Sequence, residues 1–167
     1  MYLIIIVGHT GQGKTTFAKK MIEGKRSYVF DINNEYPLHK SDKIKNPGNL
    51  IRHISGDADF FTLYASKLRG FNVVFEDSTG YLRGKQSAPF IRQIVMKRHT
   101  KNNFILLFHS VNRIPPELLE LSNVLVIFKT NDNEKDVMKK FDNGRIVDAI
   151  IKVRSLPKYQ PVIIKMI

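Results

Sequence analysis

The sequence of 167 residues contains no cysteine. This absence excludes disulfide bonds, zinc sites built on thiolates and cysteine nucleophiles. Three of the histidines, His39, His53 and His99, show no metal-ligand spacing, so a zinc site is not expected. No apolar run approaches the roughly 20 residues that span a bilayer, and the start lacks the basic region and cleavage site of a signal peptide. We therefore expect a cytoplasmic protein without a membrane span.

Acidic residues are scarce relative to basic ones. The chain has 15 Asp and Glu against 27 Lys and Arg, which gives a formal net charge of +12. Such an excess favours a polyanionic partner or an anionic membrane surface, although it can also serve solubility alone. We favour nucleic acid as the partner. Length and a hydrophobic content of 43% predict one globular domain over residues 1–167.

A glycine-rich stretch near the start matches the pattern G-x-x-x-x-G-K-[ST] at every fixed position: Gly8, His9, Thr10, Gly11, Gln12, Gly13, Lys14 and Thr15. The apolar run at 2–7 predicts a strand before it, and the spacing at 16–22 predicts a helix after it. An ordinary glycine turn is the alternative, but the complete motif between a strand and a helix favours a phosphate-binding loop.

Such a loop points backbone N–H groups at phosphates, and the helix N-terminus adds positive charge. Lys14 is expected to reach the β and γ phosphates, and the Thr15 hydroxyl to coordinate Mg²⁺. The predicted ligand is therefore ATP with Mg²⁺. The candidate nucleotide-binding residues are those of the motif together with Thr16.

Two adjacent carboxylates, Glu76 and Asp77, end the apolar run that begins at Phe71. This is the pattern of a Walker B strand, in which one acid holds the magnesium and another orients or deprotonates the attacking water. By position, Glu76 would serve the metal and Asp77 the water. The order is the reverse of the usual Asp-then-Glu, which leaves this division of labour open.

Strands and helices alternate along the rest of the chain, which predicts an α/β fold with a mostly parallel sheet and helices on both faces. A polar pair, His109 and Ser110, follows the predicted strand at 103–108, where it could contact the γ phosphate. Further strands are predicted at 26–31, 124–128 and 161–166, a short strand or turn at 49–54, a loop at 39–48, and helices at 57–68, 89–99, 115–121, 134–141 and 145–153.

These motifs together resemble the FtsK–HerA superfamily of DNA-pumping ATPases, which includes viral genome-packaging ATPases. The resemblance rests on the phosphate loop, the segment from Asp31 to Tyr36 with its Asp-x-x-x-Glu-Tyr pattern, the Walker B end, and Lys97-Arg98-His99 before the strand that ends at His109-Ser110. It implies a P-loop NTPase of the additional-strand catalytic-glutamate type. The family commonly has Thr-Gln where this chain has His109-Ser110.

The resemblance further implies a homo-oligomeric ring of five or six subunits that moves or packages double-stranded DNA, with a capsid or portal component as a possible partner and the host cytoplasm as its place if the chain is viral. Arg98 would be the arginine finger that acts on the neighbouring subunit's nucleotide. Arg83, Arg92 and Arg113 are alternatives. Two other functions stay open. One is a small-molecule phosphotransferase such as a nucleotide kinase. The other is a nucleotide-dependent switch or assembly protein, including a phage-morphogenesis or secretion ATPase that acts on protein.

Overall fold

The computed structural model describes residues 1–33, 35–36, 50–53, 66–82 and 87–166. Within this part of the chain, seven strands form one sheet in the order β3-β2-β4-β5-β1-β6-β7. All neighbouring strands are parallel except β6 and β7. The strands are β1 (Leu3–Val7), β2 (Ser27–Phe30), β3 (Leu50–His53), β4 (Asn72–Phe75), β5 (Asn103–Phe108), β6 (Val124–Ile127) and β7 (Val162–Lys165).

One strand, β5, lies between the strand that precedes the phosphate loop and the strand that ends at the two carboxylates. β5 pairs with β1 on one side and with β4 on the other, and Phe104 faces Leu3 in the first pair and Val73 in the second. This inserted strand is the feature that the additional-strand type predicts. Because β1, β4, β5 and β6 are parallel, the segments that follow them gather at one edge of the sheet.

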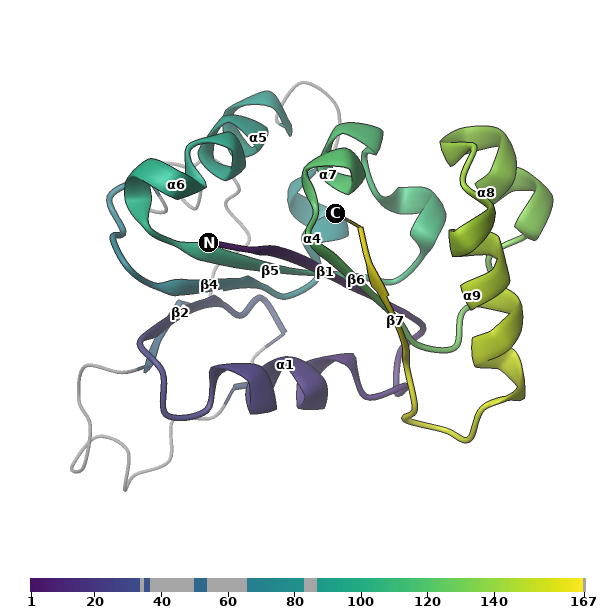
Figure 1. The fold of residues 1–167 in the computed structure, drawn as a ribbon. Helices are drawn as coiled ribbons and strands as arrows, with labels where there is room; N and C mark the ends of the chain where they lie inside the picture. Colours follow the sequence, from purple (N-terminus) through teal and green to yellow (C-terminus); the bar gives the residue numbers. More distant parts are fainter. Residues whose placement is uncertain (34, 37–49, 54–65, 83–86, 167) are drawn as a thin grey trace.

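Helices cover both faces of the sheet, as Figure 1 shows. Helix α1 (Lys14–Ile22) lies on one face, and α5 (Ser87–Val95) and α7 (Pro116–Leu121) lie on the other. Helix α9 (Gly144–Ser155) lies beside β6 and β7, and α8 (Glu134–Phe141) packs against α9. The remaining helical segments are α4 (Ser78–Tyr81), α6 (Lys97–Thr100) and the 3₁₀ turn η2 (Val111–Arg113).

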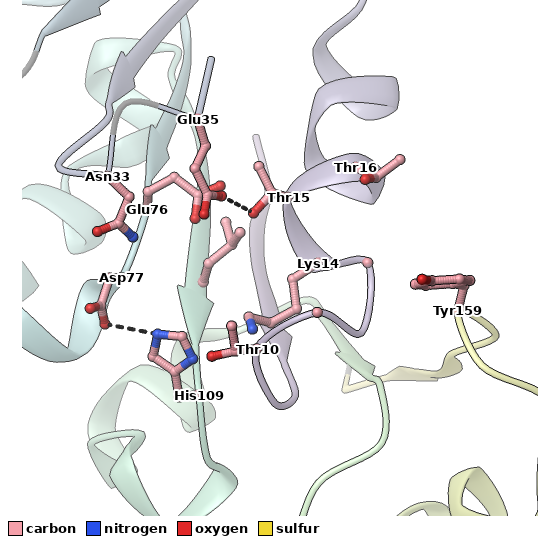
Figure 2. A pocket seen from close by; sticks show the side chains of 13 residues that line it. Thr10, Lys14, Thr15, Thr16, Asn33, Glu35, Glu76, Asp77, His109 and Tyr159 are labelled. Atoms are coloured by element: carbon pink, nitrogen blue, oxygen red, sulfur yellow. Dashed lines mark hydrogen bonds and ion pairs between the residues drawn. The ribbon is translucent and has the colours of Figure 1, made fainter. Parts of the chain in front are cut away.

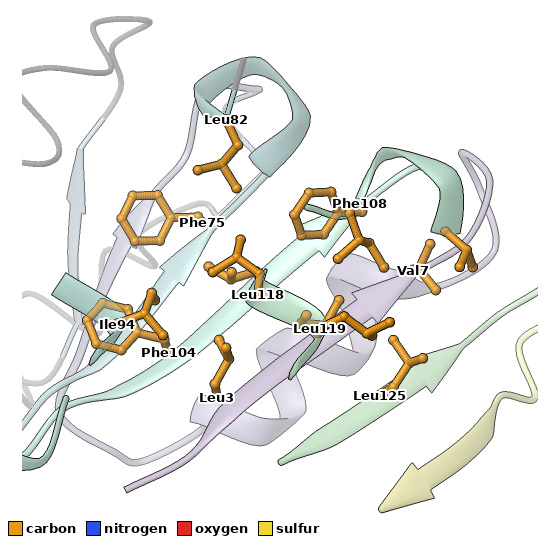
Figure 3. Packing of buried hydrophobic residues seen from close by; sticks show 14 of the residues in the cluster. Leu3, Val7, Phe75, Leu82, Ile94, Phe104, Phe108, Leu118, Leu119 and Leu125 are labelled. Atoms are coloured by element: carbon orange, nitrogen blue, oxygen red, sulfur yellow. The ribbon is translucent and has the colours of Figure 1, made fainter. Parts of the chain in front are cut away.

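The two faces carry separate apolar cores because successive strand residues point to opposite sides. On the face of α5 and α7, Leu3, Phe104 and Leu118 belong to a large buried cluster (Figure 3). On the face of α1, Ile6 and Ala18 belong to a second cluster. The predicted α/β class with helices on both faces is confirmed.

The chain departs from the predicted helix at 89–99. It forms two helices there, α5 and α6, which meet at Met96. Phe90 and Ile94 of α5 are buried, whereas Val95 is exposed. After Met96 the Nζ of Lys97 donates to the backbone oxygen of Leu121. We attribute the break at Met96 to two packing requirements, because a single straight helix would have to bury Phe90 and Ile94 and also bring Lys97 to Leu121.

The short segment predicted at 49–54 is the strand β3. The loop predicted at 39–48 lies outside the described residues, and so does most of the helix predicted at 57–68, of which residues 66–68 form a turn and loop. Among the helices of the described ranges, none has both the length and the apolar character needed to cross a bilayer.

Candidate active site

The phosphate loop runs directly over the ends of two strands. The N–H of Gly8 donates to the oxygen of Phe108 at 3.2 Å, and the N–H of His9 donates to the oxygen of Lys129 at 2.9 Å. A Cβ at Gly8 would lie only 2.6 Å from the Cβ of Phe128. The loop can therefore cross this close to β6 only because position 8 carries no side chain.

The loop leads into α1 through Gly13, which has φ +97 and precedes the first residue of the helix. The side chain of Lys14 is 7% exposed, and its Nζ donates to the oxygen of His9 at 3.0 Å. Burial lowers the pKa of Lys14, while Glu76 and Glu35 oppose that shift. This bond uses one of the three ammonium donors, so Lys14 can also donate to a phosphate placed above the loop.

A cavity of about 330 Å³ opens beside the loop (Figure 2). It brings together most of the residues that the sequence predicted for the nucleotide and its chemistry: Thr10, Gly11, Gly13, Lys14, Thr15, Thr16, Glu76, Asp77 and His109. The other predicted residues, Gly8, His9, Gln12, Ser110 and Arg98, are not in its lining. Residues that the sequence reasoning did not place there also line it, namely Asn33, Glu35, Leu107 and Tyr159.

The side chain of His9 has a partner of its own outside the cavity. Its Nε2 accepts from the N–H of Asn131, in the turn after β6, at 2.9 Å. The predicted contact of His9 with nucleotide stays a prediction. The structure supports a role for its backbone, which bonds to Lys129 and Lys14.

The segment after β2 folds back onto the cavity because of Asp31. The carboxylate of this buried residue accepts from the N–H groups of Glu35 and Tyr36 at 2.8 and 2.9 Å. Glu35 then accepts from the Thr15 hydroxyl at 2.7 Å, and the Tyr36 hydroxyl donates to Glu76 at 2.8 Å. The Asp-x-x-x-Glu-Tyr pattern marks this segment in the sequence. The sequence alone does not show that Glu35 bonds to Thr15 or that Tyr36 bonds to Glu76.

Glu76 is almost fully buried, with 3% of its surface exposed. Burial raises the pKa of Glu76 to about 7, against the opposing effect of the Tyr36 hydroxyl. Burial also raises the pKa of Tyr36, and the adjacent Glu76 adds to that rise, so Tyr36 stays protonated and donates. The protein without a ligand therefore holds Glu76 partly protonated near neutral pH.

This burial makes stability depend on pH. Because the folded pKa of about 7 lies above the ordinary 4.5, the folded state binds more protons than the unfolded state between these values, and stability falls as pH rises through that window. Glu76→Gln should remove the loss, which amounts to up to about 3 kcal/mol above pH 7. We expect its melting temperature to exceed that of the wild type by roughly 5 °C or more at pH 8, and by much less at pH 5.

The exposed Glu23, at the end of α1, supplies the matched control. Glu23→Gln should leave the melting temperature close to that of the wild type at both pH values. A gap between Glu76→Gln and the wild type that stays constant from pH 5 to pH 8 would show that Glu76 ionises normally in the folded protein.

Asp77 contributes another carboxylate to the cavity. Its φ is +48, and although it occupies the cap position of α4 its side chain makes no cap hydrogen bond. Its Oδ1 is buried without a hydrogen-bond partner among the described residues and lies 3.5 Å from Nε2 of His109. Burial and the nearby Lys14 lower the pKa of His109, so its imidazole is neutral at pH 7. The Asp77 carboxylate beside a neutral imidazole can accept a proton from a water molecule.

Ser110 faces a different partner from its neighbour His109. Its hydroxyl donates to Asp132, whose carboxylate also accepts from Thr130 and from the N–H groups of Val111 and Asn112. These hydrogen bonds lower the pKa of Asp132 although burial opposes them. Asp132 thus ties the end of β5 to the end of β6. The predicted phosphate contact fits His109 better than Ser110.

The oxygen atoms near Thr15 suit a magnesium ion that is also bound by phosphates. The Thr15 hydroxyl, Glu35 and Glu76 offer hard oxygen donors, which Mg²⁺ prefers. Among the described residues, no group of three His, Asp or Glu side chains could hold a metal without further ligands. Because Mg²⁺ usually keeps waters and shares phosphate oxygens, this sparse set fits it.

The candidate arginines lie at different edges of the sheet. Arg98 is exposed on α6, which precedes β5, whereas the cavity lies where β5 ends. Arg98 is thus remote from the cavity of its own chain. Arg113, on η2 just after β5, is exposed and contributes to the lowered pKa of His109. Arg92 is exposed on α5, and Arg83 lies outside the described residues.

No protein-family model matches the sequence, and no curated protein matches it. Solved structures do match. B204, the DNA-packaging ATPase from Sulfolobus turreted icosahedral virus, superposes with a TM-score of 0.76 at 17% identity, over 99% of this chain and 92% of that one. B204 from Sulfolobus turreted icosahedral virus 2, in complex with ATPγS, gives 0.73 at 18% identity with the same coverage.

A third match is the conjugation coupling protein TcpA of pCW3, in its monomer form with ATPγS. Its TM-score is 0.64 at 14% identity, over 98% of this chain but 57% of TcpA. At these identities the likeness shows the fold. The predicted P-loop NTPase architecture and its resemblance to a viral genome-packaging ATPase are confirmed at that level.

Proposed function

We propose that this chain hydrolyses ATP to drive the movement or packaging of double-stranded DNA as a homo-oligomeric ring in the cytoplasm. The observation that carries the proposal is the cavity in which Lys14, Asp77 and His109 converge on a sheet with the inserted strand β5. The fold shared with a DNA-packaging ATPase over 99% of this chain supports the DNA part. A capsid or portal component would then be a further partner.

The residues that line the cavity would have different roles in binding and hydrolysis. Lys14 and the backbone N–H groups of the loop bind the phosphates, and Thr15 with Glu76 would hold Mg²⁺, which neutralises phosphate charge. Glu35, bonded to Thr15, would fix the orientation of that hydroxyl. His109, neutral and beside Asp77, would donate a hydrogen bond to the γ phosphate.

Asp77 suits the water-activating role better than Glu76 does. Glu76 is buried and its carboxylate already accepts a hydrogen bond from the Tyr36 hydroxyl, so it is less accessible to an attacking water. The side chain of Asp77 lines the cavity beside His109 and is 32% exposed. We infer that Glu76 serves the metal and Asp77 the water.

A ring would complete the site with an arginine from the neighbouring subunit. Arg98 is exposed and lies at the opposite edge of the sheet from its own cavity. A guanidinium in that place can approach a γ phosphate only if another copy of the chain provides the nucleotide. We infer that Arg98 stabilises the charge that develops on the transferred phosphoryl group of the next subunit.

The DNA partner can be tested by binding at several salt concentrations. With a net charge of +12, the protein should bind duplexes of unrelated sequence with similar affinity. The logarithm of that affinity should fall linearly with the logarithm of salt, by about 0.9 for each phosphate neutralised. Fluorescence anisotropy with two labelled duplexes measures how the affinity depends on DNA sequence and on salt. Affinity that ignores salt, or that depends strongly on sequence, would contradict the proposal.

A further inference from the structure

The cavity contains an aromatic side chain that the proposed chemistry does not use. Tyr159 lies in the turn between α9 and β7, closed by a hydrogen bond from the N–H of Gln160 to the oxygen of Pro157. It lines the cavity, yet 60% of its surface is exposed. A large ring that lies open in a polar cavity is free to pack against a ligand.

The position of Tyr159 along the cavity indicates which part of a nucleotide it would meet. Figure 2 shows Asp77 and His109 on one side, Lys14 and Thr15 in the middle, and Tyr159 on the opposite side, beyond the start of α1. The terminal phosphate must lie toward Asp77 for hydrolysis. The nucleoside end of the same molecule then points away from Asp77, toward Tyr159.

We propose that Tyr159 is the platform on which the base of the bound nucleoside triphosphate stacks. The proposal rests on the nucleotide pocket of the proposed function and adds the group that recognises the base. Base–aromatic stacking uses the ring face that every base has, and it needs no hydrogen bond to the base edges.

Two neighbours lie close to the ring and leave 60% of the residue's surface exposed. A Cβ at Gly13 would lie 3.1 Å from the ring atom Cδ1 of Tyr159, so the ring lies against the phosphate loop itself. The Nζ of Lys158 lies 4.9 Å from the ring centroid. A ring that is fixed before the ligand arrives loses little conformational freedom when a base stacks on it.

The backbone conformation of Tyr159 is unfavourable for a tyrosine. Tyr159 has φ +70, a left-handed conformation that glycine or asparagine adopts more readily than a bulky aromatic residue. Since the ring is mostly exposed, its burial offsets little of that strain. Strained residues of this kind gather at ligand-binding sites.

The experiment compares two ligands that differ in the base. Binding of ATP and of inorganic tripolyphosphate, both with saturating Mg²⁺, is measured by calorimetry. Tyr159→Gly removes the ring and suits the left-handed backbone, so the variant should stay folded. It should bind ATP about 5- to 100-fold more weakly, while its affinity for tripolyphosphate changes less than about twofold. Tyr159→Phe should bind both ligands like the wild type.

Tyr2, which is 58% exposed at the opposite edge of the sheet, supplies the matched control, and Tyr2→Gly should bind ATP normally. Unchanged ATP affinity in Tyr159→Gly would overturn the stacking proposal, and so would an equal loss for ATP and tripolyphosphate, which would place the effect on the phosphate loop. A wild-type protein that binds neither ligand would overturn the proposed function, and the stacking proposal with it.

Discussion

Lys14→Ala should abolish ATP hydrolysis, with a fall in kcat of at least about a hundredfold. Lys14 is buried, with 7% of its surface exposed, and the one hydrogen-bond partner of its ammonium among the described residues is the oxygen of His9. Among the described residues that line the cavity, no other is a lysine or an arginine. The variant therefore loses the cation that would neutralise the β and γ phosphates, and ATP affinity should fall with the rate.

Steady-state phosphate release and ATP titration measure the two effects. Lys20→Ala is the matched control, since Lys20 is an exposed lysine on the same helix and does not line the cavity. It should hydrolyse and bind ATP like the wild type. Full activity in Lys14→Ala would mean that the nucleotide binds elsewhere on the chain.

Asp77→Asn should separate binding from hydrolysis. We expect kcat to fall by about 10²- to 10⁴-fold because an amide cannot accept the proton of the attacking water. ATP affinity should stay within a few-fold of the wild type, since the phosphate loop is untouched. Asparagine tolerates the left-handed backbone at this position, where φ is +48, so the turn into α4 should survive.

Asp142 is a close control because it has φ +47 at the end of α8 and does not line the cavity. Asp142→Asn should leave kcat unchanged. If Asp77→Asn hydrolyses ATP normally while Glu76→Gln does not, the roles of the two acids are exchanged.

The same variant tests whether neighbouring subunits share the site. Arg98→Ala keeps an intact cavity, and Asp77→Asn keeps an intact arginine, so a mixed ring contains some interfaces with both. Mixing the two inactive proteins should restore part of the hydrolysis. A mixture that stays inactive although both variants assemble would move the finger to another arginine, namely Arg83, Arg92 or Arg113.

The sequence predicted the parts of the site that are contiguous in the chain. The phosphate loop and the acids at the end of β4 can be recognised because their chemistry depends on neighbouring residues, such as Gly13 before Lys14. The strand and helix pattern was also readable, since buried strands are continuous apolar runs. One helix was predicted where α5 and α6 form two, because the attachment of Lys97 to Leu121 is a tertiary contact.

Other parts depend on contacts between distant segments. The hydroxyl of Tyr36 reaches Glu76 over 40 positions, and Ser110 turns to Asp132 over 22. Neither contact can be predicted from the local spacing of residues. The sequence therefore predicted no role for Glu35 and Tyr36, and it grouped Ser110 with His109. Tyr159 gave no signal, because a lone tyrosine after a proline is common in surface turns.

The central claim is that ATP hydrolysis by this chain is coupled to duplex DNA in an assembly of several copies. The most direct measurement is the rate of phosphate release per protein, with and without double-stranded DNA, over a wide range of protein concentrations. We predict a rate per protein that rises with concentration and rises further when duplex is added. A rate that is independent of both, or transfer of the phosphoryl group to a small-molecule acceptor instead of water, would contradict the claim.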